Sequence, residues 1–271
     1  MTAVTALSRP RPRRIPSLAL DGHVLAVAFI VILLAVQEIL TRTGVLPAGY
    51  FPPASEIAGA VVAELNGSAL GSALWNTMST WLLALCIAVV LGTVAGIVLG
   101  LLVPLEALLR PVIEFLRPVP SVALIPLVVL TIGTGSQSAL FLAVFAAFWQ
   151  VLVPAIAGVR AAHPVALETA RSYHLTSWQK IRWIQLPSML PYLTTAIRLA
   201  TSTTLILVVT AEIIIQMPGI GYEITMSRSA GDPARMYAYI VVSGLAGIVL
   251  NGLMRRLENH VLSAQGLGVN R

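Results

Sequence analysis

Residues 164–187, PVALETARSYHLTSWQKIRWIQLP, form a polar stretch between two long apolar parts of the chain. Two short helices are predicted inside it. Pro164 favours the first turn of one helix, because the missing N–H of proline has no helical partner there in any case. Thr176 followed by Gln179 is a capping-box pattern that starts the second helix, and Pro187 ends it or begins the next element. Helices of about three turns are not stable alone in water, so other segments or a partner must hold this stretch.

The composition is that of an integral membrane protein. Hydrophobic residues make up 57% of the 271 residues and charged residues only 10%, whereas about 25% of a soluble domain is charged. The net charge of +6 would suggest nucleic acid as the partner of a soluble chain. A DNA-binding helix-turn-helix is disfavoured here, because the basic cluster of Arg171, Lys180 and Arg182 lies between apolar spans. The single cysteine, Cys86, excludes an internal disulfide.

We predict an all-α polytopic protein in which a basic tail, residues 1–21, precedes one transmembrane domain, residues 22–271. The apolar runs predict six spans, at about residues 23–40, 74–103, 119–134, 138–159, 192–215 and 236–254. The basic tail and first run resemble a signal peptide, but no small-residue cleavage site follows, so the run is kept as a span. Prolines interrupt the third run, which predicts a kinked helix packed against protein.

The distribution of positive charge predicts the topology. Basic residues are expected mainly on the cytoplasmic side of a membrane protein. With six spans and both termini inside, only Arg42, Arg228 and Arg235 of the 17 basic residues lie outside. The count predicts cytoplasmic N and C termini, and it places the loop over residues 160–191 in the cytoplasm.

Two features of the sequence concern packing. Gly92, Gly96 and Gly100 recur every four residues in the second span, so they share one helix face and favour close contact with another helix. The connection over residues 104–118 is charged. Its Glu106 and Arg110 have helical spacing, which predicts a surface helical turn with an ion pair of a few tenths of a kcal/mol.

Three residues of the fifth span are candidates for a translocation path. Glu212 is an acid inside a span, which is costly and marks a functional site by default, unless it reaches the outer boundary or pairs within the bundle. Arg198 would attract an anion, although its simpler role is to extend to the cytoplasmic face. Thr203 belongs to a segment rich in Ser and Thr, which lines a path or bonds its own backbone and neighbouring helices.

The opening stretch resembles the EAA loop of the transmembrane subunits of ABC importers. That loop has the pattern Glu-Ala-Ala, three residues, Gly, nine residues and then Ile-x-Leu-Pro. The matching positions here are Glu168-Thr169-Ala170, His174 and Ile184-Gln185-Leu186-Pro187. Thr169 replaces an alanine, and His174 replaces the glycine, which suits a left-handed turn better than histidine does. The residues that the resemblance assigns to contact with an ATPase are Glu168, Ala170, Arg171, His174, Ile184, Leu186 and Pro187.

Other segments are similar to one branch of this family, the nitrate, sulfonate, taurine and bicarbonate permeases. These segments are Leu46-Pro47, Pro53 to Glu56, the glycine span, Leu116 to Pro120, Ala211-Glu212, Pro218 to Gly221 and Arg255 to Glu258.

The resemblance implies the permease fold of a type I ABC importer, in the inner membrane of a bacterium. This subunit would be non-catalytic and would form a homodimer with two cytoplasmic ATPases and an extracytoplasmic solute-binding protein. A helix around Leu167 to Tyr173 would dock on an ATPase. ATP and magnesium would bind the ATPases, and this chain would hold no cofactor, metal or nucleic acid. Consistent with this, the sequence has no Gly-x-x-x-x-Gly-Lys-Ser/Thr phosphate loop.

Two other functions remain as alternatives. An ion-coupled secondary transporter usually needs several intramembrane acids, and here Glu212 lies well inside a span, with Glu38 near the end of the first. An intramembrane enzyme needs a metal cluster or a nucleophile with a base, and the sequence shows neither. The resemblance leaves the substrate open among small solutes, including anions such as nitrate, a sulfonate, taurine or bicarbonate.

Overall fold

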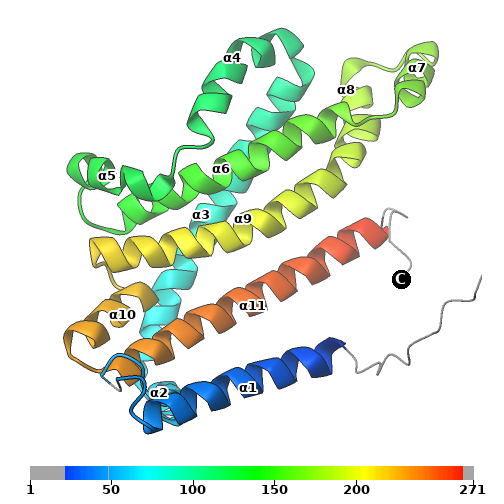
Figure 1. Cartoon of the computed structure of the whole chain (residues 1–271). Coiled ribbons are helices and arrows are strands. Elements are labelled where there is room, and N and C mark those ends of the chain that lie inside the picture. Colours follow the sequence, from blue (N-terminus) through cyan, green and yellow to red (C-terminus); the bar gives the residue numbers. More distant parts are fainter. Residues whose placement is uncertain (1–21, 48, 265–271) are drawn as a thin grey trace, which may run out of the picture. The chain divides into compact units, whose positions relative to one another are not determined.

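A computed structural model describes residues 22–47 and 49–264 (Figure 1), and all regular structure within them is helical. The predicted basic tail, residues 1–21, lies outside the described residues. The chain divides into two compact units between Ser55 and Glu56. Each unit is described by itself below.

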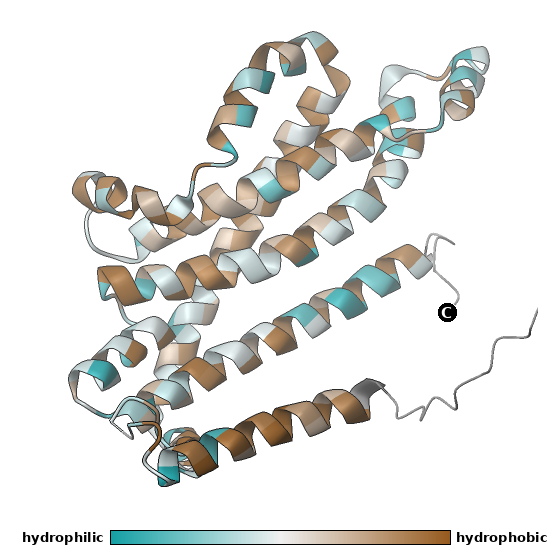
Figure 2. Cartoon of the chain, in the orientation of Figure 1, coloured by the Kyte–Doolittle hydropathy of each residue, from teal (hydrophilic) through white to brown (hydrophobic). Residues whose placement is uncertain are grey.

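The first unit contains α1, Gly22–Arg42, and the segment that follows it. The side chains of α1 are largely exposed and apolar (Figure 2), as expected of a helix that faces lipid. The following loop folds back on the end of α1, because Glu38 accepts hydrogen bonds from the Ser55 N–H at 3.0 Å and the Ser55 hydroxyl at 2.9 Å. Gln37 also donates to the Pro52 carbonyl at 3.1 Å.

The second unit is built on four long helices: α3, Ser68–Leu101; α6, Ser136–Arg160; α9, Leu186–Ile215; and α11, Pro233–Ala264. Helices α3, α6 and α9 pack against one another, and α11 packs on α9. One end of this bundle carries α7, Pro164–Ser172, and α8, Ser177–Lys180, and is called the loop end here. The opposite end carries α10, Ile220–Ser229, and is called the α10 end.

The third predicted span differs from the structure. Residues 104–118, expected as a surface connection, lie mostly in α4, Val103–Leu116. The 3₁₀ turn η1, Ser121–Leu124, and α5, Ile125–Ile132, follow at an angle of 81° to α4. Pro118 and Pro120 explain the break, because the residue before a proline is disfavoured in a helix. Five described helices are long and apolar enough to cross a membrane, and the bent pair is a sixth if it counts as one span.

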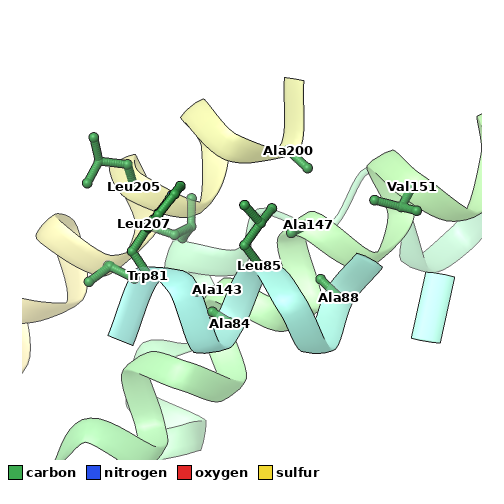
Figure 3. Packing of buried hydrophobic residues seen from close by; sticks show 11 residues of the cluster. Trp81, Ala84, Leu85, Ala88, Ala143, Ala147, Val151, Ala200, Leu205 and Leu207 are labelled. Atoms are coloured by element: carbon green, nitrogen blue, oxygen red, sulfur yellow. The ribbon is translucent and has the colours of Figure 1, made fainter. Parts of the chain in front are cut away.

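Alanine is the most frequent residue in the core between α3, α6 and α9, which also contains leucine, valine and one tryptophan (Figure 3). Ala84 and Ala88 of α3 and Ala143 and Ala147 of α6 are fully buried in it. Trp81 is the largest member, and its indole N–H donates to the Thr201 carbonyl of α9 at 3.0 Å. Small side chains allow the backbones to approach closely, which is how helices associate in a membrane.

The glycine face of α3 lies directly against α6. A Cβ atom at Gly92 would lie 2.8 Å from the Cβ of Val151, and one at Gly100 would lie 2.7 Å from the Cβ of Val159. A Cβ at Gly96 would overlap Ala155. None of the three positions therefore has room for a side chain.

Charged residues join the helices at the α10 end. The Arg235 guanidinium of α11 pairs with Glu64 at 2.8 Å and with Glu223 at 3.4 Å. Glu64 belongs to α2, Ala54–Asn66, and also accepts a hydrogen bond from the Tyr239 hydroxyl. Helix α2 is thus tied to α10 and α11.

Replacing Gly96 by alanine is expected to destabilise the protein. The added methyl group overpacks the contact with α6, at a cost of about 1–3 kcal/mol. Gly71→Ala on the same helix is the matched control, because no atom lies within 4 Å of a Cβ there. Thermal unfolding in detergent should show a lower Tm for Gly96→Ala alone, and equal Tm values for the two variants would contradict the packing described.

Candidate functional site: a coupling loop and a membrane cavity

The helix α7 projects from the loop end with its polar side chains exposed. His163 begins it, because Nδ1 of this residue accepts a hydrogen bond from the Val165 N–H at 3.3 Å, and Pro164 occupies the first turn. Glu168 and Arg171 are exposed, and no ion pair of either is found among the described residues. Ala170 is only 2% exposed, so α7 packs through its small side chain and displays its charges outward.

His174 ends α7 in a left-handed conformation, with φ of 55°. Its N–H donates to the Arg171 carbonyl at 2.9 Å, and the Leu175 N–H donates to the Ala170 carbonyl at 2.9 Å. These two hydrogen bonds form a Schellman motif, which usually has glycine at the left-handed position. The turn that the family pattern implies therefore exists with histidine in place of glycine.

The second short helix begins with the predicted capping box. The Thr176 N–H donates to the Gln179 side chain at 2.8 Å, and the Gln179 N–H donates to the Thr176 hydroxyl at 3.3 Å. Of the two roles predicted for Pro187, the structure shows the second, because this residue begins the next helix. Helix α8 continues through a π-helical turn, Ile181–Gln185, into α9, which begins at Leu186 with Pro187 in its first turn. The fifth helix thus starts several residues before the predicted span.

The surface beside α8 is aromatic and basic. Trp178 and Trp183 are 66% and 68% exposed, and the Arg182 guanidinium lies 5.6 Å from the ring centre of Trp183. Ile184 and Leu186 are half-buried where α8 joins α9. Figure 2 shows hydrophilic residues mixed with hydrophobic ones in α7 and α8, in contrast to the more uniformly hydrophobic α1. The loop end therefore presents aromatic, basic and other polar side chains on an exposed surface.

Glu212 is fully buried and has fixed partners. Its carboxylate accepts hydrogen bonds from the Thr77 hydroxyl at 2.7 Å and from the Gly221 N–H at 2.8 Å. Thr77 in turn accepts a hydrogen bond from the Ile220 N–H at 2.9 Å. A Cβ at Gly219 would overlap the Glu212 carboxylate, so glycine is required there. Glu212 thus joins α9 and α3 to the first turn of α10.

The other two candidates for the path also contact neighbouring helices. The Arg198 Nε lies 2.9 Å from the Glu258 carboxylate of α11, which also accepts a hydrogen bond from the Thr195 hydroxyl. Thr203 accepts a hydrogen bond from the Gln150 amide of α6 at 2.8 Å. The structure therefore does not bring Arg198, Thr203 and Glu212 together at one site.

A cavity of about 660 Å³ opens at the α10 end, and the sequence did not predict it. Its lining residues are Asn76, Ser79, Thr80, Leu83, Thr134, Gly135, Ser136, Gln137, Leu140, Ile215, Gln216, Met217 and Pro218. No charged residue of the described segments lines it, and Arg198, Thr203 and Glu212 are outside the lining. The signal available in the sequence was the helical spacing of Asn76, Ser79 and Thr80, which places three polar side chains on one face of α3.

The polar groups of this cavity have free hydrogen-bonding capacity. The side-chain amides of Asn76, Gln137 and Gln216 have no hydrogen-bond partner among the described residues. Amides offer both donors and acceptors, so they bind polar groups of either kind. Elsewhere in the described chain, no three His, Cys, Asp or Glu side chains gather as metal ligands.

Fold and site together define a polytopic helical membrane protein that displays a short helical loop at one end and a polar cavity at the other. The family described as binding-protein-dependent transport system inner membrane component matches residues 88–263, and the chain belongs to this family. The match leaves out α1, α2 and the part of α3 that carries Asn76, Ser79 and Thr80.

Individual relatives are permeases. The chain is 32% identical over 150 residues to the taurine transport system permease protein TauC of Escherichia coli strain K12, covering 55% of this chain and 53% of that protein. It is 29% identical over 157 residues to the putative aliphatic sulfonates transport permease protein SsuC of Bacillus subtilis strain 168, covering 58% and 57%. The nitrate import permease protein NrtB of Leptolyngbya laminosa is 25% identical over 154 residues, covering 57% and 55%. The chain thus spans a little over half the length of these relatives.

Among solved structures, a chain from inward-facing conformations of the MetNI methionine ABC transporter is similar in fold, with a TM-score of 0.63. The similarity covers 71% of this chain and 96% of that chain at 17% sequence identity. This likeness concerns the fold alone.

Substitution of Glu212 is expected to act on stability. Glu212→Ala leaves the Thr77 hydroxyl and the Gly221 N–H without an acceptor, at about 1–3 kcal/mol for each buried group. Glu212→Gln keeps one acceptor oxygen and should cost less. Thermal unfolding of both variants checks this order, whereas a Glu212→Ala protein as stable as the wild type but deficient in uptake would place Glu212 in the path instead.

Proposed function

We propose that this chain is the transmembrane subunit of an ATP-driven importer and forms the path for a small solute delivered by a binding protein. The observation that carries the proposal is the exposed α7, which the Schellman turn at His174 presents at one end of a bundle belonging to a family of binding-protein-dependent transport components. In this proposal two copies of the chain assemble with two cytoplasmic ATPases, which bind ATP and magnesium.

The charges support an orientation with the loop end in the cytoplasm. Arg171, Lys180 and Arg182 lie in or beside α7 and α8, whereas Arg228 and Arg235 lie in or beside α10. Basic residues are enriched on the cytoplasmic side. Closure of the ATPases on ATP would then push α7, and the movement would pass through α6 and α9, which flank the loop, to the rest of the bundle.

The surroundings of the buried Glu212 favour this function over an ion-coupled secondary transporter. A carboxylate that carries a coupling ion must exchange its partners with the ion during transport. Glu212 is instead held by Thr77 and by the first turn of α10, with no access to the cavity. The arrangement is that of a structural acceptor.

The cavity at the α10 end supports a small polar solute as the cargo. We propose that it is the outer mouth of the path, where the solute arrives from the binding protein. Its neutral amides and hydroxyls can bind an oxyanion by hydrogen bonds alone. A permanent positive charge in the cavity would instead hold the solute too tightly to release it. The names of the relatives, which include taurine, sulfonate and nitrate permeases, are consistent with such a solute.

Glu168→Lys is expected to abolish ATP-driven uptake without unfolding the protein, because Glu168 is exposed and would meet the ATPase with the wrong charge. Uptake of taurine, an aliphatic sulfonate and nitrate into proteoliposomes, with the partner ATPase and binding protein present, is the measurement. Glu114→Lys, at an exposed position of α4, is the matched control. Normal uptake by Glu168→Lys, with the control also normal, would remove α7 from the coupling role.

Asn76→Leu is expected to raise the KM for uptake roughly threefold to tenfold, the loss of about one hydrogen bond to the solute. Ser72→Leu on the same helix is the control, because Ser72 is exposed but does not line the cavity. Initial uptake rates over a range of solute concentrations measure both variants. An unchanged KM for Asn76→Leu would exclude this wall of the cavity from the path.

A further inference from the structure

Arg160 occupies the junction between α6 and the coupling loop. It is the last residue of α6, and α7 begins at Pro164. Its guanidinium donates to the Leu99 carbonyl at 3.1 Å and to the Gly100 carbonyl at 3.3 Å. These carbonyls belong to the last turn of α3, where they lack helical partners and carry the negative end of the helix dipole. Arg160 therefore binds the end of α6 to the end of α3.

The same guanidinium reaches α4. Both of its terminal nitrogens lie 3.5 Å from the Glu106 carboxylate, which is only 7% exposed as a residue. Arg110 of α4 also binds this carboxylate, at 3.0 and 3.2 Å. The sequence predicted the local pair with Arg110 as a surface contact, but the structure shows a buried carboxylate shared by two cations. A buried charge of this kind depends on its partners.

Within the part of the chain that the structure describes, Arg160 provides the polar link between α4 and the ends of α3 and α6. Arg110 lies on α4 itself, so it does not join helices. The rest of α4 packs little, because Leu108 and Phe115 are each 72% exposed and Val112 is 49% exposed. Figure 1 shows α4 leaving the bundle between the end of α3 and α5. The direction of α4 at this end therefore depends on the Glu106 contact.

We propose that Arg160 is a positioning residue that carries movement of the coupling loop to α4. The inference rests on the proposed function, in which an ATPase moves α7. When α7 moves, the end of α6 moves with it. The Arg160 guanidinium, which binds the Glu106 carboxylate, then shifts the first turn of α4. The loop would thus act on the bent α4 and α5 segment as well as on α6 and α9.

The test uses the complex purified with its ATPase and measures distances between spin labels with and without MgATP. Cys86→Ser removes the single native cysteine. A label pair at Leu108→Cys and Phe141→Cys reports the movement of α4 relative to α6. A second pair at Ser177→Cys and Phe141→Cys reports the movement of the loop itself. All three labelled positions are exposed.

We expect MgATP to shift both distances in the otherwise wild-type complex. Arg160→Gln should abolish the α4 shift and keep the loop shift, because it removes the link between helices. Arg110→Gln is the matched control, since it also removes one cation from Glu106 but leaves that link, and it should keep both shifts. Arg160→Lys should reduce the α4 shift, because lysine keeps the charge but lacks the planar fork. If Arg160→Gln does not fold, the Arg160→Lys variant serves as the test in its place.

The outcomes separate the two proposals. An α4 shift that persists unchanged in Arg160→Gln, or in Arg160→Lys if only that variant folds, overturns the role of Arg160 while leaving the proposed function intact. An equal loss in Arg110→Gln also overturns it, because charge balance at Glu106 would then be the cause. Absence of both shifts without any Arg160 substitution would contradict the proposed function itself.

Discussion

The contact between α3 and α6 is the constraint on which the rest of the fold depends. Gly92, Gly96 and Gly100 present no side chain to α6, so the two helix backbones meet directly. Lipid is as apolar as the helix surfaces, so close packing rather than a hydrophobic drive holds such helices together. Helix α9 packs on both, and the residues that join α6 to α9 are displayed at one end. The position of the loop that carries α7 and α8 is thus determined by contacts far from it in sequence.

Much of the fold could be predicted because its signals are local. Each helix-start signal lies within one turn of the helix that it begins. Pro164 lies in the first turn of α7, and Thr176 and Gln179 form the capping box of α8. The long apolar runs also correspond to long helices. The shape of the third predicted span was harder to predict, because hydropathy shows that a segment is apolar but not where it bends. There the prolines at 118 and 120 separate α4 from α5, and neither piece alone is as long as the other spans.

The polar contacts inside the bundle could not be predicted, because they join residues distant in sequence. Glu212 was identified as costly in a span, but its partner Thr77 lies on another helix. The pairing of Glu106 with Arg110 could be predicted from their helical spacing. Its second partner, Arg160, lies at the end of α6 and could not be predicted in this way. The cavity gave a weak signal for a different reason. Its amides and hydroxyls are neutral, so they cost less in a span than charges and do not stand out in the sequence.

His174 shows that the turn after α7 requires a backbone shape rather than glycine as such. Its φ of 55° is the conformation that closes α7, and the two hydrogen bonds of the turn are complete with an imidazole attached. Asparagine and aspartate enter this region with similar ease. A search pattern that demands glycine here would therefore reject chains whose loop is equally well formed. The loop is better defined by one left-handed residue at a fixed distance from Glu168 and Pro187.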